Sequence, residues 1–361
     1  MKITLLTILL FLAGILQPAD PYISSKDYDV NSFHRGKQSS KSPKRVYIQK
    51  FRVLFEVFEE ASASTKGTTN NRANRATTVS GTKTSMGVQL SGVDIPDFQK
   101  IVDEAYADFV AQLEADGYEI ISAEEAGKTD YYSGYELVKG GASSTDQATG
   151  FVMVTPQGYD YWVKGIANDG REKGTFTDTS SKLSQDLGDA YVAEATFIFP
   201  FVALDASSTS FANYASSKVK ADINLRMAAA IGATDNEQMS LGKFAKGFTQ
   251  SSTSARLASQ VRFVAGHLIS SPAFDSSTGL KRDVYFEDIF AETKLVEVTS
   301  AEVATFSKTA YPQLVMVSGG ELNLASHYVA CDKDNYVKSA KGSISELIGS
   351  GISNFKELVK D

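Results

Sequence analysis

Cysteine is nearly absent from this chain of 361 residues, in which Cys331 is the only one. An intramolecular disulfide is therefore excluded, and so is a zinc site built on pairs of cysteines. The chain must obtain its stability from a hydrophobic core. Its apolar content of 42% is sufficient to form one.

A basic surplus is lacking as well. The formal net charge is −7, which argues against a nucleic-acid-binding protein, because such proteins usually carry an excess of basic residues. The GxSxG, GxxxxGK[ST], GxGxxG and HExxH motifs of common hydrolases, nucleotide-binding proteins and zinc proteases are missing too. The sequence therefore predicts no catalytic residue and no cofactor. We favour a non-enzymatic protein, although the motifs leave enzymatic activity open.

Histidine is scarce, with three copies in the chain. His34 lies in a polar stretch, and His267 lies in an apolar segment that favours a structural histidine. His327 precedes Cys331 by four positions in a segment typical of a strand. Residues four apart on a strand are separated by roughly 13 Å, which is too far for a shared ligand or a thiol–imidazole hydrogen bond. We therefore predict no metal site here.

The N-terminus has the pattern of a secretory signal. Lys2 precedes an uncharged apolar run at residues 3–16, and a polar exit containing Pro18 follows. The run is shorter than the roughly 20 residues that a membrane-spanning helix needs. A basic start, a short apolar core and a polar exit are typical of a signal peptide. We predict a signal peptide at residues 1–19 and an exported protein of the periplasm or the extracellular space.

Two polar stretches flank the first apolar strand pattern. Residues 20–45 lack apolar periodicity and are predicted to be a flexible leader. Residues 62–92 are rich in Ser, Thr, Gly and Asn and contain no acidic residue. A loop of this length is either mobile or functional, so we expect a solvated loop or, alternatively, a basic arm that is ordered by an anionic partner or a neighbouring subunit. Its basic residues are Lys66, Arg72, Arg75 and Lys83.

The pattern between residues 46 and 121 predicts an α/β unit. Apolar residues alternate with polar ones at residues 46–58, as in a half-buried strand. Asp94 is suited to cap a helix with Pro96 in its first turn, and Gly117 is suited to end that helix. A short strand at residues 118–121 follows, and the two strands are expected to lie parallel.

Strand patterns dominate the rest of the chain. We predict an α+β fold in which the strand–loop–helix–strand unit continues into a strand-rich, mostly antiparallel region and a C-terminal helix. That helix is expected from about Asn335, with a break near its glycines. Residues 46–361 are expected to form one large domain, with a subdivision near 125–190 left open. The predicted strands are 131–138, 150–163, 191–204, 218–227, 261–269, 284–290, 294–298, 314–317 and 328–330.

Residues 46–125 resemble the α/β domain of bacterial envelope assembly proteins of the curli-secretion-channel type. The resemblance lies in VYIQKFRVLFEVF, then a polar loop, then IPDFQKIVDEAYADFVAQLEADG and YEIISAEEA. The family's lipid-anchored cysteine is absent here. The resemblance implies a ring-forming or scaffold protein of the periplasm or outer membrane. Our first hypothesis is therefore an exported, non-enzymatic envelope scaffold or assembly subunit, whose partners are copies of itself or other envelope proteins.

A second hypothesis rests on the aromatic residues between positions 131 and 162. An exposed strip of Tyr159, Tyr161 and Trp162 beside carboxylates is the pattern of an exported hydrolase or carbohydrate-binding protein. Packing of these rings across neighbouring strands is the alternative.

A third hypothesis is an oligomeric outer-membrane pore subunit. Residues 191–204 and 218–227 have the length of membrane-spanning strands, roughly 9–11 residues, and residues 205–217 are suited to join them as a hairpin. Residues 195–203, however, are apolar on both faces, as in a strand buried between two layers. Pro200 also interrupts a central strand ladder. We therefore favour a soluble core for this segment, and membrane association is the less favoured alternative.

Overall fold

The fold is α+β, as the sequence predicts. The protein is described here by a computed structural model. The predicted signal peptide and the predicted strand at 314–317 lie outside the described residues. The described residues are 20–34, 42–65, 68–72, 75–79, 82–148, 150–173, 178–211, 214–231, 257–268, 271–291, 295–297 and 327–360.

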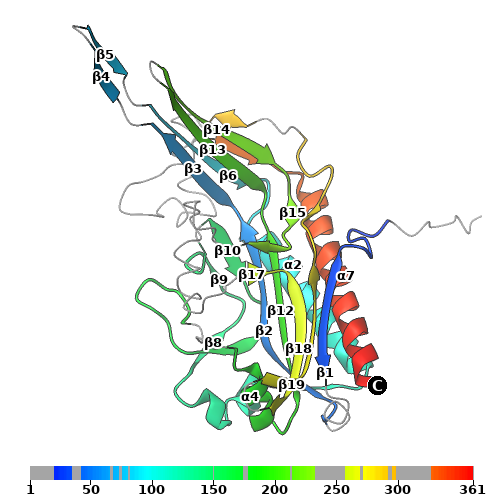
Figure 1. Cartoon of the computed structure of the whole chain (residues 1–361). Coiled ribbons are helices and arrows are strands. Elements are labelled where there is room, and N and C mark those ends of the chain that lie inside the picture. Colours follow the sequence, from blue (N-terminus) through cyan, green and yellow to red (C-terminus); the bar gives the residue numbers. More distant parts are fainter. Residues whose placement is uncertain are drawn as a thin grey trace, which may run out of the picture.

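A sheet of eight strands forms the body of the described part of the chain (Figure 1). Its order is β1-β19-β18-β12-β2-β10-β9, and β7 pairs with β2 beside this path. β12 is parallel to β2 and antiparallel to β18. The strands are β1 (Tyr28–His34), β2 (Arg45–Glu56), β7 (Glu119–Ile121), β9 (Ser143–Ser144), β10 (Phe151–Val154), β12 (Tyr191–Phe199), β18 (Gln260–Leu268) and β19 (Ser271–Leu280).

The predicted α/β unit is confirmed. The helix α2 (Ile95–Ala115) begins at Asp94, which forms a reciprocal capping box with Asp97. Gly117 follows the helix with a φ of 82°, a left-handed conformation that glycine adopts without strain. β7 then pairs with β2 in parallel, as expected for two strands joined through a helix.

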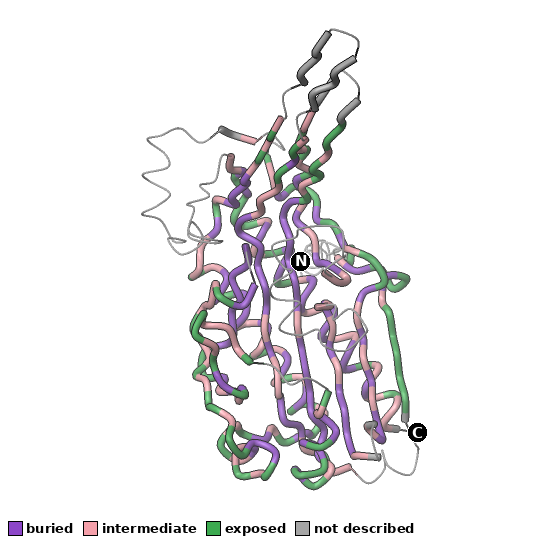
Figure 2. The backbone as a smooth tube through the Cα atoms, turned by 60° about the vertical axis from the view of Figure 1, so that its left-hand side comes forward, coloured by how far each residue is buried: buried purple, intermediate pink, exposed green. Residues whose placement is uncertain are grey.

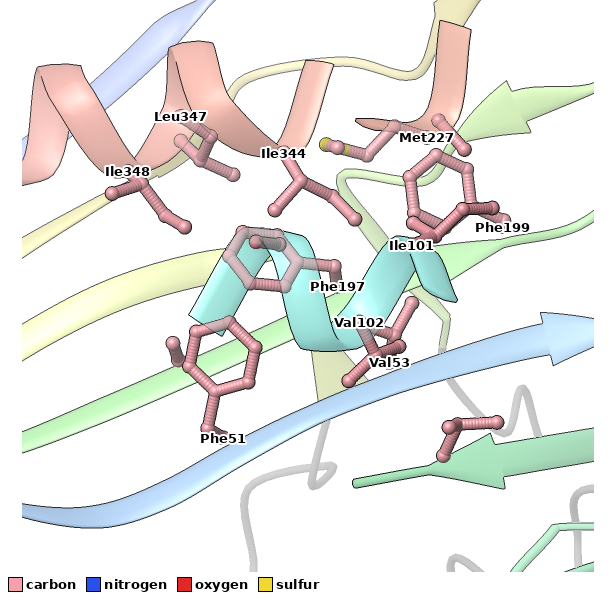
Figure 3. Packing of buried hydrophobic residues seen from close by; sticks show 14 of the residues in the cluster. Phe51, Val53, Ile101, Val102, Phe197, Phe199, Met227, Ile344, Leu347 and Ile348 are labelled. Carbon is pink, nitrogen blue, oxygen red and sulfur yellow. The ribbon is translucent and has the colours of Figure 1, made fainter. Parts of the chain in front are cut away.

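Two helices, α2 and α7 (Lys333–Lys360), lie against one face of the sheet (Figures 1 and 3). Alternate side chains of β2 are apolar and face these two helices. The ring of Phe55 on β2 stacks on the ring of Phe98 on α2, with centroids 4.3 Å apart. Phe263 stacks on Phe355 of α7 at 4.1 Å. Each fully buried phenylalanine contributes about 1.5–3 kcal/mol relative to an exposed one, so this layer is the main source of stability.

The expected break in the C-terminal helix is wrong, because α7 is continuous from Lys333 to Lys360. Its glycines allow close packing instead. A Cβ on Gly342 would lie 2.2 Å from the ring of Tyr22, and one on Gly351 would lie 2.8 Å from Cβ of Val261. Tertiary packing therefore outweighs the low helix propensity of glycine.

The prediction of a flexible leader is wrong for residues 20–34, because these residues pack on the body. β1 forms the edge of the sheet and pairs with β19 in antiparallel fashion. Ile23 is buried, and the backbone N–H groups of Tyr22 and Ile23 donate to the carboxylate of Glu346 on α7 at 3.0 and 2.8 Å. These contacts are with residues more than 300 positions away, so local sequence carries no sign of them.

The second face of the sheet carries short elements and no long helix among the described residues. The predicted strand at 131–138 is a strand only from Glu136, because Tyr131 and Tyr132 lie in a 3₁₀ turn. These elements are α3 (Ala123–Ala126), η1 (Asp130–Tyr132), β8 (Glu136–Lys139), β11 (Asp160–Val163) and α4 (Ser180–Asp186). Three further pairs of short strands occur in the described chain: β15 (Arg226–Met227) with β20 (Val284–Tyr285), β16 (Ala230–Ile231) with β17 (Leu257–Ala258), and β21 (Val296–Glu297) with β22 (His327–Ala330).

Within the same residues, no helix is both long and apolar enough to cross a membrane.

Candidate functional site

The stretch at residues 62–92, predicted as a loop, is a β-hairpin instead. β3 (Phe58–Ser64) pairs with β6 (Lys83–Ser91), and β4 (Thr68–Arg72) pairs with β5 (Arg75–Val79), all antiparallel. Threonine and valine favour strands, but the many serines and alanines obscure the alternation that would reveal them. The hairpin projects away from the body of the molecule (Figures 1 and 2).

A second hairpin is formed by β13 (Val202–Phe211) and β14 (Tyr214–Ile223). The observed strands therefore do not coincide with the strands predicted at 191–204 and 218–227. The first is divided at Pro200, because β12 ends at Phe199 as a buried central strand, and β13 begins at Val202. β12 is almost entirely buried on both faces, as expected for a strand between two layers.

The two hairpins lie side by side, and β13 and β14 run along β3 (Figure 1). The hydroxyl of Thr84 on β6 lies 2.8 Å from the hydroxyl of Ser217 on β14, and it donates to the carbonyl oxygen of Ser217 at 3.1 Å. Apolar side chains close to the roots of the hairpins extend the core between them. These are Met86, Leu204 and Ala221.

The second hairpin has two different faces. The face that includes Ser217 also carries the cross-strand pairs Leu204–Ala221 and Ala206–Val219. The opposite face carries the pair Asp205–Lys220, and both of these side chains are exposed. Lys218 and Asp222 are also exposed on that face. The hairpin is therefore amphipathic, with a face of small and apolar residues and a charged face.

Glu56 joins the roots of the two hairpins. It is the last residue of β2, where the chain turns toward β3, and its carboxylate accepts from the N–H groups of Phe201 and Val202 at 2.9 and 3.3 Å. Only 5% of the residue is exposed. Burial raises the pKa of Glu56 well above its usual range, more than its hydrogen bonds lower it.

The predicted basic arm is distributed along the first hairpin. Arg72, the last residue of β4, and Arg75, the first residue of β5, are partners in the register of these two strands. Lys83 is exposed where β6 begins, opposite Ser64. Lys66 lies outside the described residues. The hairpin therefore brings two of the four predicted basic residues together at one end.

The predicted aromatic strip is not exposed at its tyrosines. Tyr159 and Tyr161 are 4% and 5% exposed, and their hydroxyls donate to Ile48 O at 3.3 Å and to the Glu172 carboxylate at 2.6 Å. Trp162 is half-buried, and its indole N–H donates to Ala123 O at 2.8 Å. The exposed-strip interpretation is therefore wrong for both tyrosines, and the carbohydrate-binding hypothesis loses its main support.

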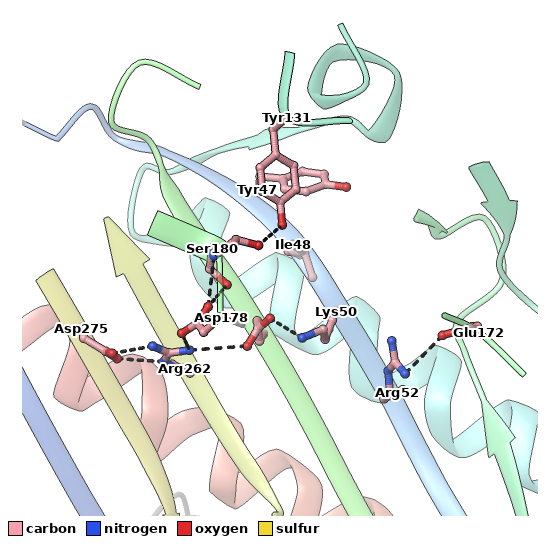
Figure 4. A network of polar contacts seen from close by, with 12 residues as sticks. Tyr47, Ile48, Lys50, Arg52, Tyr131, Glu172, Asp178, Ser180, Arg262 and Asp275 are labelled. Carbon is pink, nitrogen blue, oxygen red and sulfur yellow. Dashed lines mark hydrogen bonds and ion pairs between the residues drawn. The ribbon is translucent and has the colours of Figure 1, made fainter. Parts of the chain in front are cut away.

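A network of ion pairs lies on the second face of the sheet (Figure 4). Arg262 on β18 pairs with Asp275 at 2.5 Å and with Asp178, next to α4, at 2.7 Å. Two further pairs, Lys50–Glu194 at 2.6 Å and Arg52–Glu172 at 3.4 Å, lie beside it. Burial raises the pKa of Asp178, but the charge of Arg262 and hydrogen bonds from Ser180 and Arg262 outweigh it, so the pKa lies below its usual range. Each charge has a partner, so this network holds α4 and the strands together and leaves little charge for a ligand.

Comparisons of this chain with protein-family models, curated proteins and solved structures gave no match.

The only cysteine is unsuited to nucleophilic chemistry. Cys331 is buried, and its burial raises the pKa of the thiol to about 12, so the thiol stays protonated at neutral pH. His327 lies on β22 as predicted, and His267 forms a hydrogen bond with the Ser181 hydroxyl at 3.0 Å. No cluster of three or more His, Cys, Asp or Glu side chains suited to a metal ion occurs in the part of the chain that the structure describes.

Sequence reasoning missed the residues that organise the paired hairpins. Glu56 looks like an ordinary polar residue of an alternating strand, and Thr84 and Ser217 lie in polar stretches without a motif. The clean alternation at residues 218–227 was the one signal of the second hairpin.

Proposed function

We propose that the protein is an exported, non-enzymatic assembly subunit of the cell envelope, and that its paired hairpins contact neighbouring copies of the chain. The projection of the two hairpins from the body, which consists of the eight-stranded sheet and the helices packed on it, supports this proposal most directly (Figure 1). β13 and β14 pair only with each other within the described residues, and a strand with an unpaired edge is a template for further strands. The resemblance of residues 46–125 to envelope assembly proteins points in the same direction.

The contact surface is assigned to the small-residue face of the second hairpin. Ala206 lies on this face and is exposed in the single chain. The first hairpin therefore leaves this face uncovered at Ala206, although it contacts the same face at Ser217, and Leu204 packs against the core. The charged face with Asp205 keeps the other side of the hairpin soluble.

The test is the molar mass of the full chain, measured by light scattering after size-exclusion chromatography over a wide concentration range. The wild-type protein is expected to form a defined oligomer. Ala206→Lys places a charge on the contact face and is expected to yield monomers, whereas Asp205→Lys, on the opposite face of the same strand, is expected to leave the oligomer intact. A wild-type chain that stays monomeric at every concentration contradicts the proposal.

Export is tested separately. The N-terminal sequence of protein recovered from outside the cytoplasm is expected to begin after the apolar run at residues 3–16. Recovery of the intact chain with Met1 from the cytoplasm alone contradicts export.

A pore subunit is the second candidate. β13 and β14 are each 10 residues long, which equals the roughly 9–11 residues of a membrane-spanning strand, and their side chains alternate between a small, apolar face and a charged face. If this candidate is right, the exported protein stays in the membrane fraction after high-salt and carbonate washes and is released by detergent. Release with the soluble exported fraction contradicts it.

A further inference from the structure

One carboxylate connects the points at which both hairpins leave the body. Glu56 ends β2, and two residues later β3 begins the first hairpin. Its Oε2 accepts from the backbone N–H groups of Phe201 and Val202, where β13 begins the second hairpin. Pro200 precedes them and has no N–H of its own, so the central strand ladder stops here and the side chain of Glu56 takes over the pairing.

The surroundings of Glu56 do not neutralise its charge. Two charged groups influence it from the neighbouring elements, Glu59 on β3 and Arg226 on β15. Arg226 is directed elsewhere, since its Nε donates to Asp283 at 3.0 Å and its Nη1 lies 3.5 Å from the carbonyl oxygen of Val202. Within the described residues, Glu56 forms no salt bridge. The carboxylate is held by two backbone N–H groups, and only 5% of the residue is exposed.

We propose that Glu56 is a proton-controlled latch: its neutral form holds the root of the second hairpin on the body, and its ionisation loosens that root. Burying an ionised carboxylate without a cationic partner is costly. Opening the root lets water reach the charge and removes this cost. The neutral acid remains compatible with the closed root, because its carbonyl oxygen still accepts from the two N–H groups.

The direction of the pH dependence follows from the linkage between proton binding to Glu56 and closure of the hairpin root. Burial raises the pKa of Glu56 in the closed root, whereas in an open, hydrated root the pKa returns to about 4.3. The closed root therefore binds the proton more tightly, and its advantage is complete below the pKa of the open form. As the pH rises through the pKa of the closed form, that advantage is lost, by up to about tenfold in the ratio of closed to open roots per pH unit.

The use of this latch to control when hairpins become available to other copies rests on the proposed function. The latch itself is a property of the single chain, and its test reads the hairpin root without requiring assembly. The two proposals therefore fail independently.

The test is hydrogen exchange of the full chain between pH 4.5 and 8, expressed as protection factors that remove the intrinsic pH dependence of exchange. The reporters are the N–H groups of Asn224 and Arg226, which donate to Phe201 O at 2.9 Å and to Pro200 O at 3.0 Å. In the wild-type protein their protection is expected to fall as the pH rises, by up to about tenfold per unit within the titration of Glu56. Amides of α2 serve as the internal reference and are expected to stay constant.

Glu56→Gln removes the titration and is expected to keep the root protected, with a flat pH profile. Glu59→Gln is the matched control on the neighbouring strand; it is expected to move the transition to lower pH and to preserve it. If Glu56→Gln does not fold, Glu56→Met is the substitute, with weaker but equally pH-independent protection. A flat wild-type profile, or a Gln or Met variant that follows the wild-type transition, overturns the proposal.

Discussion

The hydroxyl groups of Thr84 and Ser217 lie 2.8 Å apart, although 133 residues separate them in the chain. This contact, with the bond from Thr84 to Ser217 O, joins the two hairpins above their apolar roots. Thr84→Val removes the hydroxyl with little change of shape and is expected to lower the free energy of unfolding by about 1 kcal/mol, measured by urea denaturation. Thr209→Val, at an exposed position of β13, is the control and is expected to have little effect. Equal effects of both substitutions would contradict a link between the hairpins.

The ion-pair network around Arg262 is expected to be important for stability. Arg262→Gln leaves the carboxylates of Asp178, Glu194 and Asp275 without their shared cation. We expect a loss of about 3 kcal/mol in the free energy of unfolding, because removing one partner of a largely buried pair leaves an uncompensated charge in the interior. Lys128→Gln breaks a pair whose side chains are 73% and 87% exposed, and it is expected to cost less than about 0.5 kcal/mol. Chemical denaturation at neutral pH measures the free energy of unfolding of both variants. Comparable losses would show that the network contributes no more than an exposed ion pair.

The lowered pKa of Asp178 predicts how the stability of the protein changes at acidic pH. Its pKa is lowered in the folded protein, so its ionised form contributes stability that is present above the unfolded pKa of about 3.9 and is lost as the pH falls through the folded pKa. Asp178→Asn is expected to be less stable than wild type at pH 7 and to lose less further stability between pH 5 and pH 3. Thermal unfolding over this range measures the difference, and parallel wild-type and variant curves would exclude the contribution.

Two glycines of α7 are expected to respond oppositely to the same substitution. A Cβ on Gly349 has Gln112 Oε1 as its nearest neighbour at 4.0 Å, whereas a Cβ on Gly351 would lie 2.8 Å from Val261 Cβ. Gly349→Ala is expected to stabilise the helix by about 0.5–1 kcal/mol. Gly351→Ala is expected to destabilise the protein by about 1–3 kcal/mol through overpacking. Stabilisation by both substitutions, measured by urea denaturation, would contradict the close contact of α7 with β18.

Local patterns were strong enough to predict the unit from β2 through α2 to β7. Asp94, Pro96 and Gly117 mark the ends of α2 by chemistry that acts within one helical turn, and the structure places those ends accordingly. The strands of the buried sheet were predicted where apolar residues dominate, as in β12 and β18. Each of these signals is local, so it is readable without knowledge of the fold.

The strands β1, β19 and β3 to β6 escaped prediction. They contain serine, threonine, glycine and proline in amounts typical of loops, and they become strands because a neighbouring strand satisfies their backbone N–H and C=O groups. Ser271–Leu280 is an example, since it pairs with β18 on one side and β1 on the other.

The sequence by itself determined the α+β class, the capped helix α2, the apolar central strands and the C-terminal helix, because periodicity and capping act between residues a few positions apart. Only the tertiary structure decided the hairpin pair, the burial of Tyr159 and Tyr161, and the position of Glu56 between two hairpin roots. These features depend on contacts such as that of Glu56 with Phe201, 145 residues away, and the free energy of burial that creates them is a property of the assembled core rather than of any segment.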